Sequence, residues 1–438
     1  MAIGPVEIMK KILIISYNFA PRHTVGAIRP TKLAQYLSLD GYEVDVVAVK
    51  PFGELDHSLD AVFDYINHID EIGSPIMVER SVPKNVKNSA PLAPKTLSRK
   101  DKAIKALKTE YRESKKIINS KHFAKDFDKL VCSDIKRFSS YDAFITTYGP
   151  VASHLCGLVM KKRCPDVKWI ADFRDPMVFS DHHGWVKAYR ASLQKKVCSK
   201  AEELVTISQG TFDEVFTDKN SKEKGHIIFN GFDRRDFDLA NASPDGEFSF
   251  MCVGAMYAGR RDISVLLKVF DELIKENKLK KEELKIKYAG NNISQVLEQA
   301  SKFDLCDCVT DFGVLSRADC LKAQASCRHL VLPNWNCTTA KGVLPGKFFE
   351  YMMVGRPIIS VVCGDLPDSE ISSVIKKGNL GISYEEARDK NDYPLLKKYI
   401  EEDIARFRNG EDCKSSPDLE TVNKFDFSNT AKEFEKLI

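Results

Sequence analysis

The sequence lacks several features that would each place a protein in a simple class. No uninterrupted apolar run approaches the ~18 residues of a membrane-spanning helix, and the net charge of +4 is too small to indicate nucleic-acid binding. The first eight residues contain neither the basic nor the apolar segment of a secretory signal, and we expect the natural chain to start at Met9. With 43% apolar and 29% charged residues, the composition excludes disordered and fibrous classes.

Two familiar site signatures are also missing. The twelve cysteines are scattered, and their one cluster (Cys306, Cys308, Cys320 and Cys327) does not have the spacing of a zinc site. We therefore expect no metal, and reduced thiols in a cytoplasmic protein. The loop after the first expected strand is not GxGxxG, so it gives no support for a dinucleotide cofactor.

What is present is an alternation of short apolar runs, loops and amphipathic helices, repeated in both halves of the chain. The first unit of this kind has an expected strand at 11–16, a helix at 27–39 and a strand at 43–49. A polar linker at 241–246 follows, and the pattern restarts with a strand at 248–253. Since 438 residues suffice for two or three domains, we predict two doubly wound α/β domains.

The most informative stretch is 337–363, which lies between two apolar runs that read as buried parallel strands. A helix is expected to begin at Pro345-Gly346 and to end at Gly355 in the left-handed conformation. Lys347 and Glu350 share a face of its first turn. A helix N-terminus with a lysine favours phosphate, and a carboxylate can accept hydrogen bonds from a ribose, which together predict a nucleoside-diphosphate pocket. The alternative is an ordinary surface Lys–Glu pair.

Further candidate residues follow other expected strands. Gly26 would let backbone approach a ligand near Arg29, and Arg260-Arg261 repeat this arrangement after the strand at 248–253. The strand at 167–173 ends in a charged group made of Asp172, Arg174 and Asp175. Charged residues at this end of a parallel strand line the crevice where α/β sheets bind ligands. The alternative is an internal ion pair in which Arg174 holds both carboxylates. His154 is a weaker candidate, since a lone histidine of this kind more often packs.

The segment 84–129 is strongly basic, with fourteen Lys and Arg against five Asp and Glu. A helix at 103–119 would carry a rough apolar stripe consisting of Ile104, Leu107, Tyr111, Ile117 and Ile118. A basic amphipathic helix can lie on an anionic membrane or face an anionic acceptor. A solvated helical insertion is the other interpretation.

These features together resemble the GT-B-fold glycosyltransferases, specifically the bacterial family 4-like enzymes that use nucleotide sugars. The motifs that carry the resemblance run in order along nearly the whole chain: ISYNFAPRHTVGAIRPTKLAQYL, WIADFRDPM, VTIS, IIFNGFD, YAGRRD, DFGVLSRADCLKAQ and GVLPGKFFEYMMVGRPII. Most of them are weak individually, but their order and spacing are specific.

The resemblance implies an acceptor domain at 1–240, with the basic insertion at about 84–129, and a donor domain at 247–417. A final segment, 418–438, would return to the first domain. Glu350 would bind the donor ribose, while Gly346, Lys347, Arg260 and Arg261 would hold the diphosphate. Gly26 would let a loop close over the phosphates. The acceptor-side or catalytic candidates are Arg174, Asp175 and His154, with Arg29 and Asp172 lining the cleft.

The implied activity is metal-independent, hexosyltransferase-type transfer from a UDP- or GDP-type sugar, with retention and within bacterial surface-polysaccharide assembly. The acceptor would be a carbohydrate or a lipid-linked carbohydrate, handled in the cytoplasm or at the inner face of the membrane. Three departures stand out: Gly342 replaces a glutamate that helps to orient the sugar, an apolar residue near Leu266 replaces a phosphate-binding lysine, and Met177 replaces a tryptophan. Alternative functions are a non-catalytic scaffold and a nucleotide-sugar epimerase.

Overall fold

The computed structural model describes residues 9–22, 24–53, 55, 57–73, 99–179, 182–240, 242–338 and 340–438. They form two compact units. Unit 1 comprises the chain up to Phe229 together with Phe427–Ile438, and unit 2 comprises Asn230–Asp426. Residues 1–8, which precede the expected natural start, and the first part of the basic segment, residues 84–98, lie outside the described residues.

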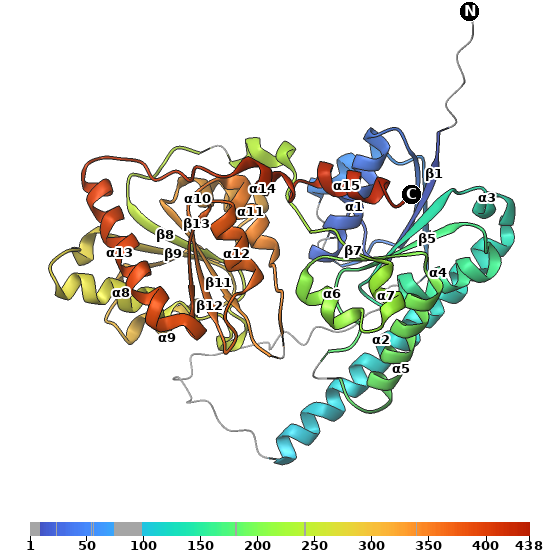
Figure 1. Cartoon of the computed structure of the whole chain (residues 1–438), viewed down its shortest axis with the longest axis horizontal. Helices are drawn as coiled ribbons and strands as arrows, with labels where there is room; N and C mark the ends of the chain where they lie inside the picture. Colours follow the sequence, from blue (N-terminus) through green and yellow to red (C-terminus); the bar gives the residue numbers. More distant parts are fainter. Residues whose placement is uncertain are drawn as a thin grey trace, which may run out of the picture. The chain divides into compact units, whose positions relative to one another are not determined.

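The described residues of unit 1 form a seven-stranded parallel sheet with the order β3-β2-β1-β4-β5-β6-β7 (Figure 1). Its strands are β1 (Lys11–Ser16), β2 (Glu43–Val49), β3 (His68–Ile72), β4 (Ala143–Thr147), β5 (Lys168–Phe173), β6 (Glu203–Thr206) and β7 (Gly225–Ile227). The α-helices are α1 (Val25–Leu39), α2 (Arg99–Ser133), α3 (Ile135–Ser139), α4 (Ala152–Arg163), α5 (Gly184–Lys200), α6 (Gln209–Val215), α7 (Lys219–Glu223) and α15 (Phe427–Glu435), with a 3-10 turn η1 (His57–Asp64).

Both faces of this sheet are covered, which explains why its central strands are apolar at successive positions. In β1, Leu13 and Ile15 pack into one core cluster, while Ile12 and Ile14 pack into the cluster on the other face. Side chains alternate between faces along a strand, so a continuous apolar run fills both layers. The edge strand β3 (HIDEI) lacks this pattern and was not predicted.

The described residues of unit 2 form a six-stranded parallel sheet with the order β10-β9-β8-β11-β12-β13. Its strands are β8 (Phe248–Val253), β9 (Leu284–Ala289), β10 (Val309–Asp311), β11 (His329–Trp335), β12 (Ile358–Cys363) and β13 (Gly381–Glu385). Its helices are α8 (Ser264–Lys275), α9 (Ile293–Ser301), α10 (Arg317–Ser326), α11 (Gly346–Val354), α12 (Glu370–Lys377), α13 (Asp389–Arg408) and α14 (Leu419–Asn423). The 3-10 turns are η2 (Arg234–Ala240), η3 (Tyr257–Gly259), η4 (Lys281–Glu283), η5 (Cys306–Cys308) and η6 (Glu386–Arg388).

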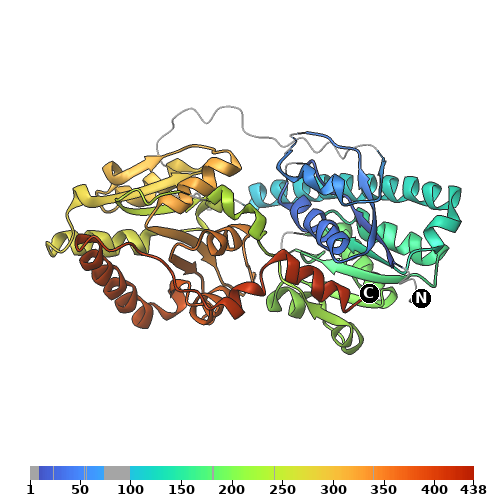
Figure 2. The same cartoon turned by 90° about the horizontal axis from the view of Figure 1, so that it is seen from above.

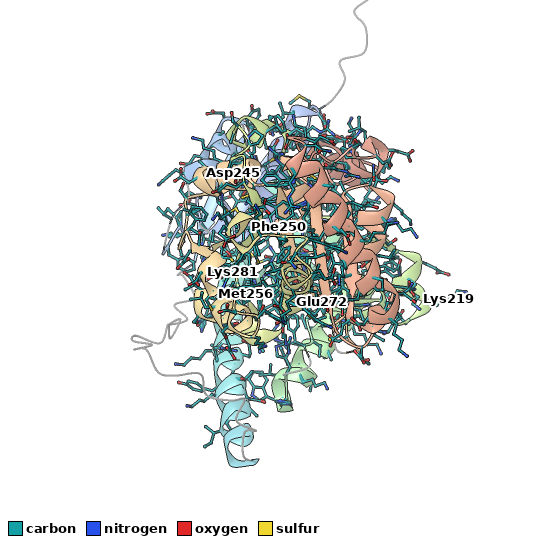
Figure 3. All side chains as sticks on the ribbon, turned by 90° about the vertical axis from the view of Figure 1, so that its left-hand side faces the viewer. Lys219, Asp245, Phe250, Met256, Glu272 and Lys281 are labelled. Atoms are coloured by element: carbon teal, nitrogen blue, oxygen red, sulfur yellow. The ribbon has the colours of Figure 1, made fainter. Side chains whose placement is uncertain are left out.

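The core of unit 2 lies between its sheet and the helices that cover it. Phe250 on β8, labelled in Figure 3, is buried and stacks against His329 at 5.1 Å between ring centroids. Helix α8 contributes Leu266, Leu267 and Phe270 to the same cluster. Leu266 stands where the resemblance would place a phosphate-binding lysine, and its burial shows that a packing residue occupies this position.

The unit boundaries differ slightly from the predicted domain boundaries. Residues 230–240, which we expected in the first domain, belong to unit 2, where η2 is tied to α10 by the ion pair between Asp236 and Arg317. Residues 418–426 also belong to unit 2, because Phe425 packs against Phe349 at 5.7 Å. The return of the chain to unit 1 therefore begins at Phe427, and Figure 2 shows α15, in dark red, beside α1.

The strand order creates one reversal point in each sheet. In unit 1 the chain moves outward in opposite directions from β1 and β4, and in unit 2 from β8 and β11. Loops that leave the carboxyl ends of such neighbouring strands form the crevice in which doubly wound sheets bind ligands. A ligand-binding site is therefore expected at these two reversal points.

Candidate functional site

The first turn of α11 is fixed firmly at the reversal point of unit 2. The helix ends at Gly355 with φ +75°, as predicted for a left-handed cap. The buried Tyr351 hydroxyl accepts a hydrogen bond from the Val253 amide (3.2 Å) and donates one to the Val331 carbonyl (3.4 Å). Because Val253 and Val331 belong to the neighbouring strands β8 and β11, this side chain anchors the helix over the reversal point.

Lys347 and Glu350 form the predicted pair on this first turn. The Lys347 Nζ lies 2.6 Å from the Glu350 Oε2, and the side chains are 30% and 24% exposed. Gly346 opens the helix beside them and is exposed. The pair thus combines a cation, a carboxylate and the free N–H groups of a helix N-terminus in a solvent-accessible place.

Gln324 on α10 holds the carboxylate of this pair, and it was not predicted from the sequence. Its fully buried amide Nε2 donates to the Glu350 Oε2 at 3.3 Å and to the Cys320 sulfur at 3.1 Å. The side chain therefore orients Glu350 from behind. A single glutamine on an expected helix carries no signal of its own, since only the packing of α10 against α11 brings it to the carboxylate.

The structure separates the roles of Arg260 and Arg261, which follow β8. The Arg261 guanidinium is buried, lies 4.7 Å from the Tyr257 ring and 5.6 Å from the Trp335 ring, and donates to the Ala255 carbonyl at 2.9 Å. Arg261 thus ties the loop after β8 to the end of β11. Arg260 is exposed, so it can meet a ligand.

The reversal point of unit 1 is packed around the guanidinium of Arg174. A Cβ atom added to Gly26 would lie 2.9 Å from the Asn18 Nδ2 and 3.2 Å from the Arg174 Nη1. A Cβ atom added to Gly149, whose φ is +115°, would lie 3.3 Å from the Arg174 Nη2. Two glycines thus make room for one guanidinium, whose close approach requires them.

Arg174 keeps a donor available in this crevice. Its Nη2 contacts the Asp175 carboxylate at 3.3 Å, whereas its buried Nη1 has no hydrogen-bond partner among the described residues. Asp175 is 47% exposed. A buried, unsatisfied guanidinium donor is costly, so it favours an incoming anion or hydroxyl. Gly26, which we expected at the donor phosphates, thus lies beside Arg174, which contacts Asp175.

Arg29 and Asp172 do not line a crevice, which corrects the expectation from the resemblance. They are 2% and 0% exposed, and the Arg29 Nε and Nη2 donate to the two Asp172 oxygens at 2.9 and 3.1 Å. Arg29 also donates to the carbonyls of Ile228 and Phe229 at 2.9 and 2.8 Å. The internal ion pair left open by the sequence exists, but Arg29 rather than Arg174 makes it with Asp172.

His154 is a core residue. Its ring is fully buried, lies 4.7 Å from Phe173, and its Nδ1 is 2.7 Å from the Thr146 hydroxyl. Burial lowers the pKa of His154 to about 3, so the imidazole stays neutral at ordinary pH. The packing interpretation fits this position, and we do not propose His154 as an acceptor-side residue.

One buried group of metal-ligand types occurs among the described residues: His329, Asp403 and Cys413. Both Asp403 oxygens accept hydrogen bonds from Arg328, each at 2.8 Å, and one also contacts the His329 Nε2 at 2.7 Å. A guanidinium already satisfies this carboxylate, so the group is an ion-pair cluster that fixes α13 to the start of β11. Across the part of the chain that the structure describes, every helix is too short or too polar to cross a membrane.

Comparison with known proteins agrees with this architecture. Residues 247–390 match the family Glycosyl transferases group 1, while no curated protein matches the sequence. Similar solved structures include a glycosyltransferase from Rickettsia africae ESF-5 (16% identity, TM-score 0.54, 98% of this chain and 97% of that chain covered). HepE from Anabaena in complex with UDP (12%, 0.59, 98% and 99%) and sucrose-phosphate synthase from Thermosynechococcus elongatus (14%, 0.58, 98% and 98%) are also similar.

At these identities the solved structures show a shared fold, whereas the family match rests on the sequence of the unit that carries Lys347 and Glu350. The predicted resemblance is confirmed at the level of the fold: this chain has the GT-B fold of glycosyltransferases, and its residues 247–390 match the model of the family Glycosyl transferases group 1.

Proposed function

We propose that this protein transfers a sugar from a nucleoside-diphosphate sugar to an acceptor hydroxyl. The observation that carries the proposal is the partly exposed Lys347–Glu350 pair at the N-terminus of α11, in the same unit as the exposed Arg260. On binding, Lys347 would exchange the Glu350 carboxylate for a donor phosphate. Glu350 would then accept hydrogen bonds from the ribose hydroxyls while Gln324 keeps it oriented.

The same groups would favour the chemical step. Breaking the bond between the sugar C1 and the diphosphate oxygen leaves the electron pair, and thus negative charge, on the diphosphate. Lys347, Arg260 and the N–H groups of α11 would stabilise this charge, which is the role of preorganised donors in a transition state. The acceptor hydroxyl oxygen bonds to C1, and its proton passes to an oxygen of the departing diphosphate. We propose that these cationic groups make the transfer independent of a metal ion and that the anomeric configuration is retained.

We assign Arg174 and Asp175 to acceptor recognition, because they form the polar group at the reversal point of unit 1 and Arg174 has an unsatisfied donor. Hydroxyl groups of a carbohydrate suit a guanidinium beside a carboxylate. A hexose donor and an acceptor from a growing surface polysaccharide, free or lipid-linked, complete the proposal.

UDP is the nucleotide that we favour over GDP. HepE, with the same fold, has been solved in complex with UDP.

Gly342 bears on the sugar rather than on the nucleotide: its φ of +64° is a left-handed conformation that suits glycine. The resemblance implies a sugar-orienting carboxylate at this position, and we propose that another group takes this role here.

The deciding experiment is a thermal-shift measurement with UDP, GDP, ADP, TDP and CMP on the wild type and on Glu350→Ala. A ligand at ~100 times its dissociation constant adds about 2.7 kcal/mol to the free energy of unfolding. We expect UDP to raise the melting temperature of the wild type and not that of Glu350→Ala. Glu370→Ala, on α12, is the matched control and should respond like the wild type. No shift with any nucleotide would contradict the donor pocket.

A second assay separates transfer from the alternatives. Incubation with UDP-hexoses should release UDP quickly only when an acceptor is added, and EDTA should not change the rate. An epimerase would convert the donor without acceptor. A non-catalytic scaffold would give neither product, and its biological role would survive Glu350→Ala.

A further inference from the structure

Helix α2 has two separate apolar faces. Ile117, Phe123, Phe127 and Val131 are buried against unit 1. A second set is exposed: Ile104, Leu107, Tyr111 and Ile118 are 42%, 70%, 63% and 50% exposed. The spacings of three, four and seven residues place this second set on one side of the helix. The predicted stripe had joined Ile117 and Ile118, whereas the structure buries Ile117 and exposes Ile118. We call the four exposed residues the α2 stripe.

The α2 stripe cannot turn inward, because polar contacts fix the rotation of the helix. The buried Glu113 carboxylate accepts a hydrogen bond from the Arg190 Nη2 on α5 at 2.7 Å. One turn earlier, the Glu110 Oε1 accepts from the Val186 amide of the same helix at 3.4 Å. Figures 1 and 3 show the first turns of α2, in cyan, extending beyond the helices packed on it. The stripe is therefore a permanent surface feature of about 21 Å, given 1.5 Å per residue over 104–118.

Exposed lysines border the α2 stripe along its length. Lys108 and Lys115 stand three residues before and four residues after Tyr111, and the Lys115 Nζ lies 4.5 Å from the Tyr111 ring centroid. Lys121 and Lys125 follow Ile118 by three and seven positions on the same side. Within the described ranges, no carboxylate lies within ion-pair distance of these four lysines. Their charge is thus available to a partner.

Three acidic residues of α2 are already paired with other cations. Glu113 pairs with Lys116 and Arg190, Asp126 with Lys129, and Asp128 with Arg163. Next to the stripe, α5 adds the half-exposed Trp185, which packs against Tyr189 at 6.1 Å between centroids. Tyr189 in turn lies 4.6 Å from the Lys121 Nζ. Apolar and aromatic side chains next to lysines are the combination found at the boundary between headgroups and acyl chains.

We propose that the α2 stripe is a membrane-binding surface. It would insert its apolar side chains at the headgroup boundary of an anionic bilayer, with Lys108, Lys115, Lys121 and Lys125 contacting lipid phosphates. A second copy of the chain fits less well, since pairing two stripes would bring the bordering lysines of both copies together. The inference does not depend on the donor chemistry, because it rests only on unit 1.

The test is cosedimentation of the full chain with two kinds of vesicle at about 0.1 M salt: phosphatidylcholine alone, and phosphatidylcholine with about 30% phosphatidylglycerol. We expect binding to the anionic vesicles only, weakened by a rise in salt. Leu107→Ser with Tyr111→Ser should reduce the affinity at least about tenfold, as should Lys108→Glu with Lys115→Glu. Leu395→Ser and Lys219→Glu, at exposed positions elsewhere, are the controls and should bind like the wild type.

All the substituted residues are exposed, so circular dichroism should show unchanged folding in every variant. Wild-type protein that stays in solution with anionic vesicles would overturn the proposal, as would equal binding by the stripe variants. Light scattering tests the alternative that a second copy of the chain binds the α2 stripe. A dimer that Leu107→Ser with Tyr111→Ser converts to a monomer would assign the stripe to a second copy and would also overturn the proposal. Because vesicle binding needs no sugar nucleotide, its failure is distinguishable from failure of the proposed function.

Discussion

Two pairs of oppositely charged side chains lie near the reversal points, one in each unit, and they differ in their exposure to solvent. Arg29–Asp172 in unit 1 is 2% and 0% exposed, and Arg29 also caps the carbonyls of Ile228 and Phe229. Lys347–Glu350 in unit 2 is 30% and 24% exposed. The first pair has exchanged water for protein partners and is part of the packing. The second pair retains access to solvent, so a ligand can replace one of its members.

The largest effect should follow from breaking the buried pair. Arg29→Leu leaves the Asp172 carboxylate buried without its guanidinium, and we expect a loss of about 3–5 kcal/mol in the free energy of unfolding. Urea denaturation measures this loss. The double variant Arg29→Leu with Asp172→Leu removes the uncompensated charge, so it should be more stable than Arg29→Leu alone. Additive losses in the double variant would show that the two side chains do not act as a pair.

A second buried pair, in unit 2, tests whether burial rather than location decides the role. Although burial opposes ionisation, hydrogen bonds from His329 and Arg328 hold the pKa of the Asp403 carboxyl well below its usual range. The stabilisation is then fully present above the unfolded pKa of about 3.9 and is lost as the pH falls below it toward the folded pKa.

Asp403→Asn should therefore cost about 3 kcal/mol at neutral pH and about 1 kcal/mol less near pH 3, which is only about one unit below the unfolded pKa. Urea denaturation across pH 3–7 gives the two profiles. Parallel profiles for variant and wild type would contradict the pairing. Asp412→Asn is the control, because its carboxylate, which contacts the buried Arg356, is itself 36% exposed.

The exposed pair should behave in the opposite way. Lys347→Ala removes a half-exposed ion pair and should change the free energy of unfolding by less than about 1 kcal/mol. Its effect should appear in ligand binding, with a loss in affinity for UDP of about tenfold, or 1.4 kcal/mol. Calorimetric titration measures the affinity, and Lys322→Ala on α10 is the control. A large loss of stability without a change in affinity would make this pair structural, like Arg29–Asp172.

The smallest effect concerns the side chain behind the exposed pair. Gln324→Leu keeps the volume but removes the amide that orients Glu350, and we expect an increase in KM for the donor of about three- to tenfold, with kcat nearly unchanged. Gln324→Asn, which keeps the amide on a shorter stem, should have a KM for the donor between those of the wild type and Gln324→Leu. An effect on kcat alone would show that Gln324 does not act through donor binding.

Sequence patterns predicted the two doubly wound units because parallel strands buried on both faces are continuously apolar and because helix ends carry local signals. Gly355 ends its helix in the left-handed conformation, as expected. The edge strand β3 escaped prediction, since a partly solvated edge does not need apolar residues.

The candidate site was predictable only where a single local element holds it. Lys347 and Glu350 meet because they stand three residues apart on one helix. Whether Arg29 or Arg174 pairs with Asp172 depends on which strands are neighbours, and these positions are far apart in the sequence. The position of His154 among aromatic rings and the separation of Ile117 from Ile118 likewise depend on packing, which local spacing does not specify.

The position of α15 has a consequence for the order in which the protein is made. Phe427, Ala431, Phe434 and Leu437 belong to the core of unit 1, although Asn230–Asp426 folds into unit 2 between them and the rest of that core. A ribosome must therefore release all of unit 2 before unit 1 can close one face of its sheet. The unit that begins synthesis first is the last to be completed, and during that interval its exposed apolar face is a site where chaperones can bind.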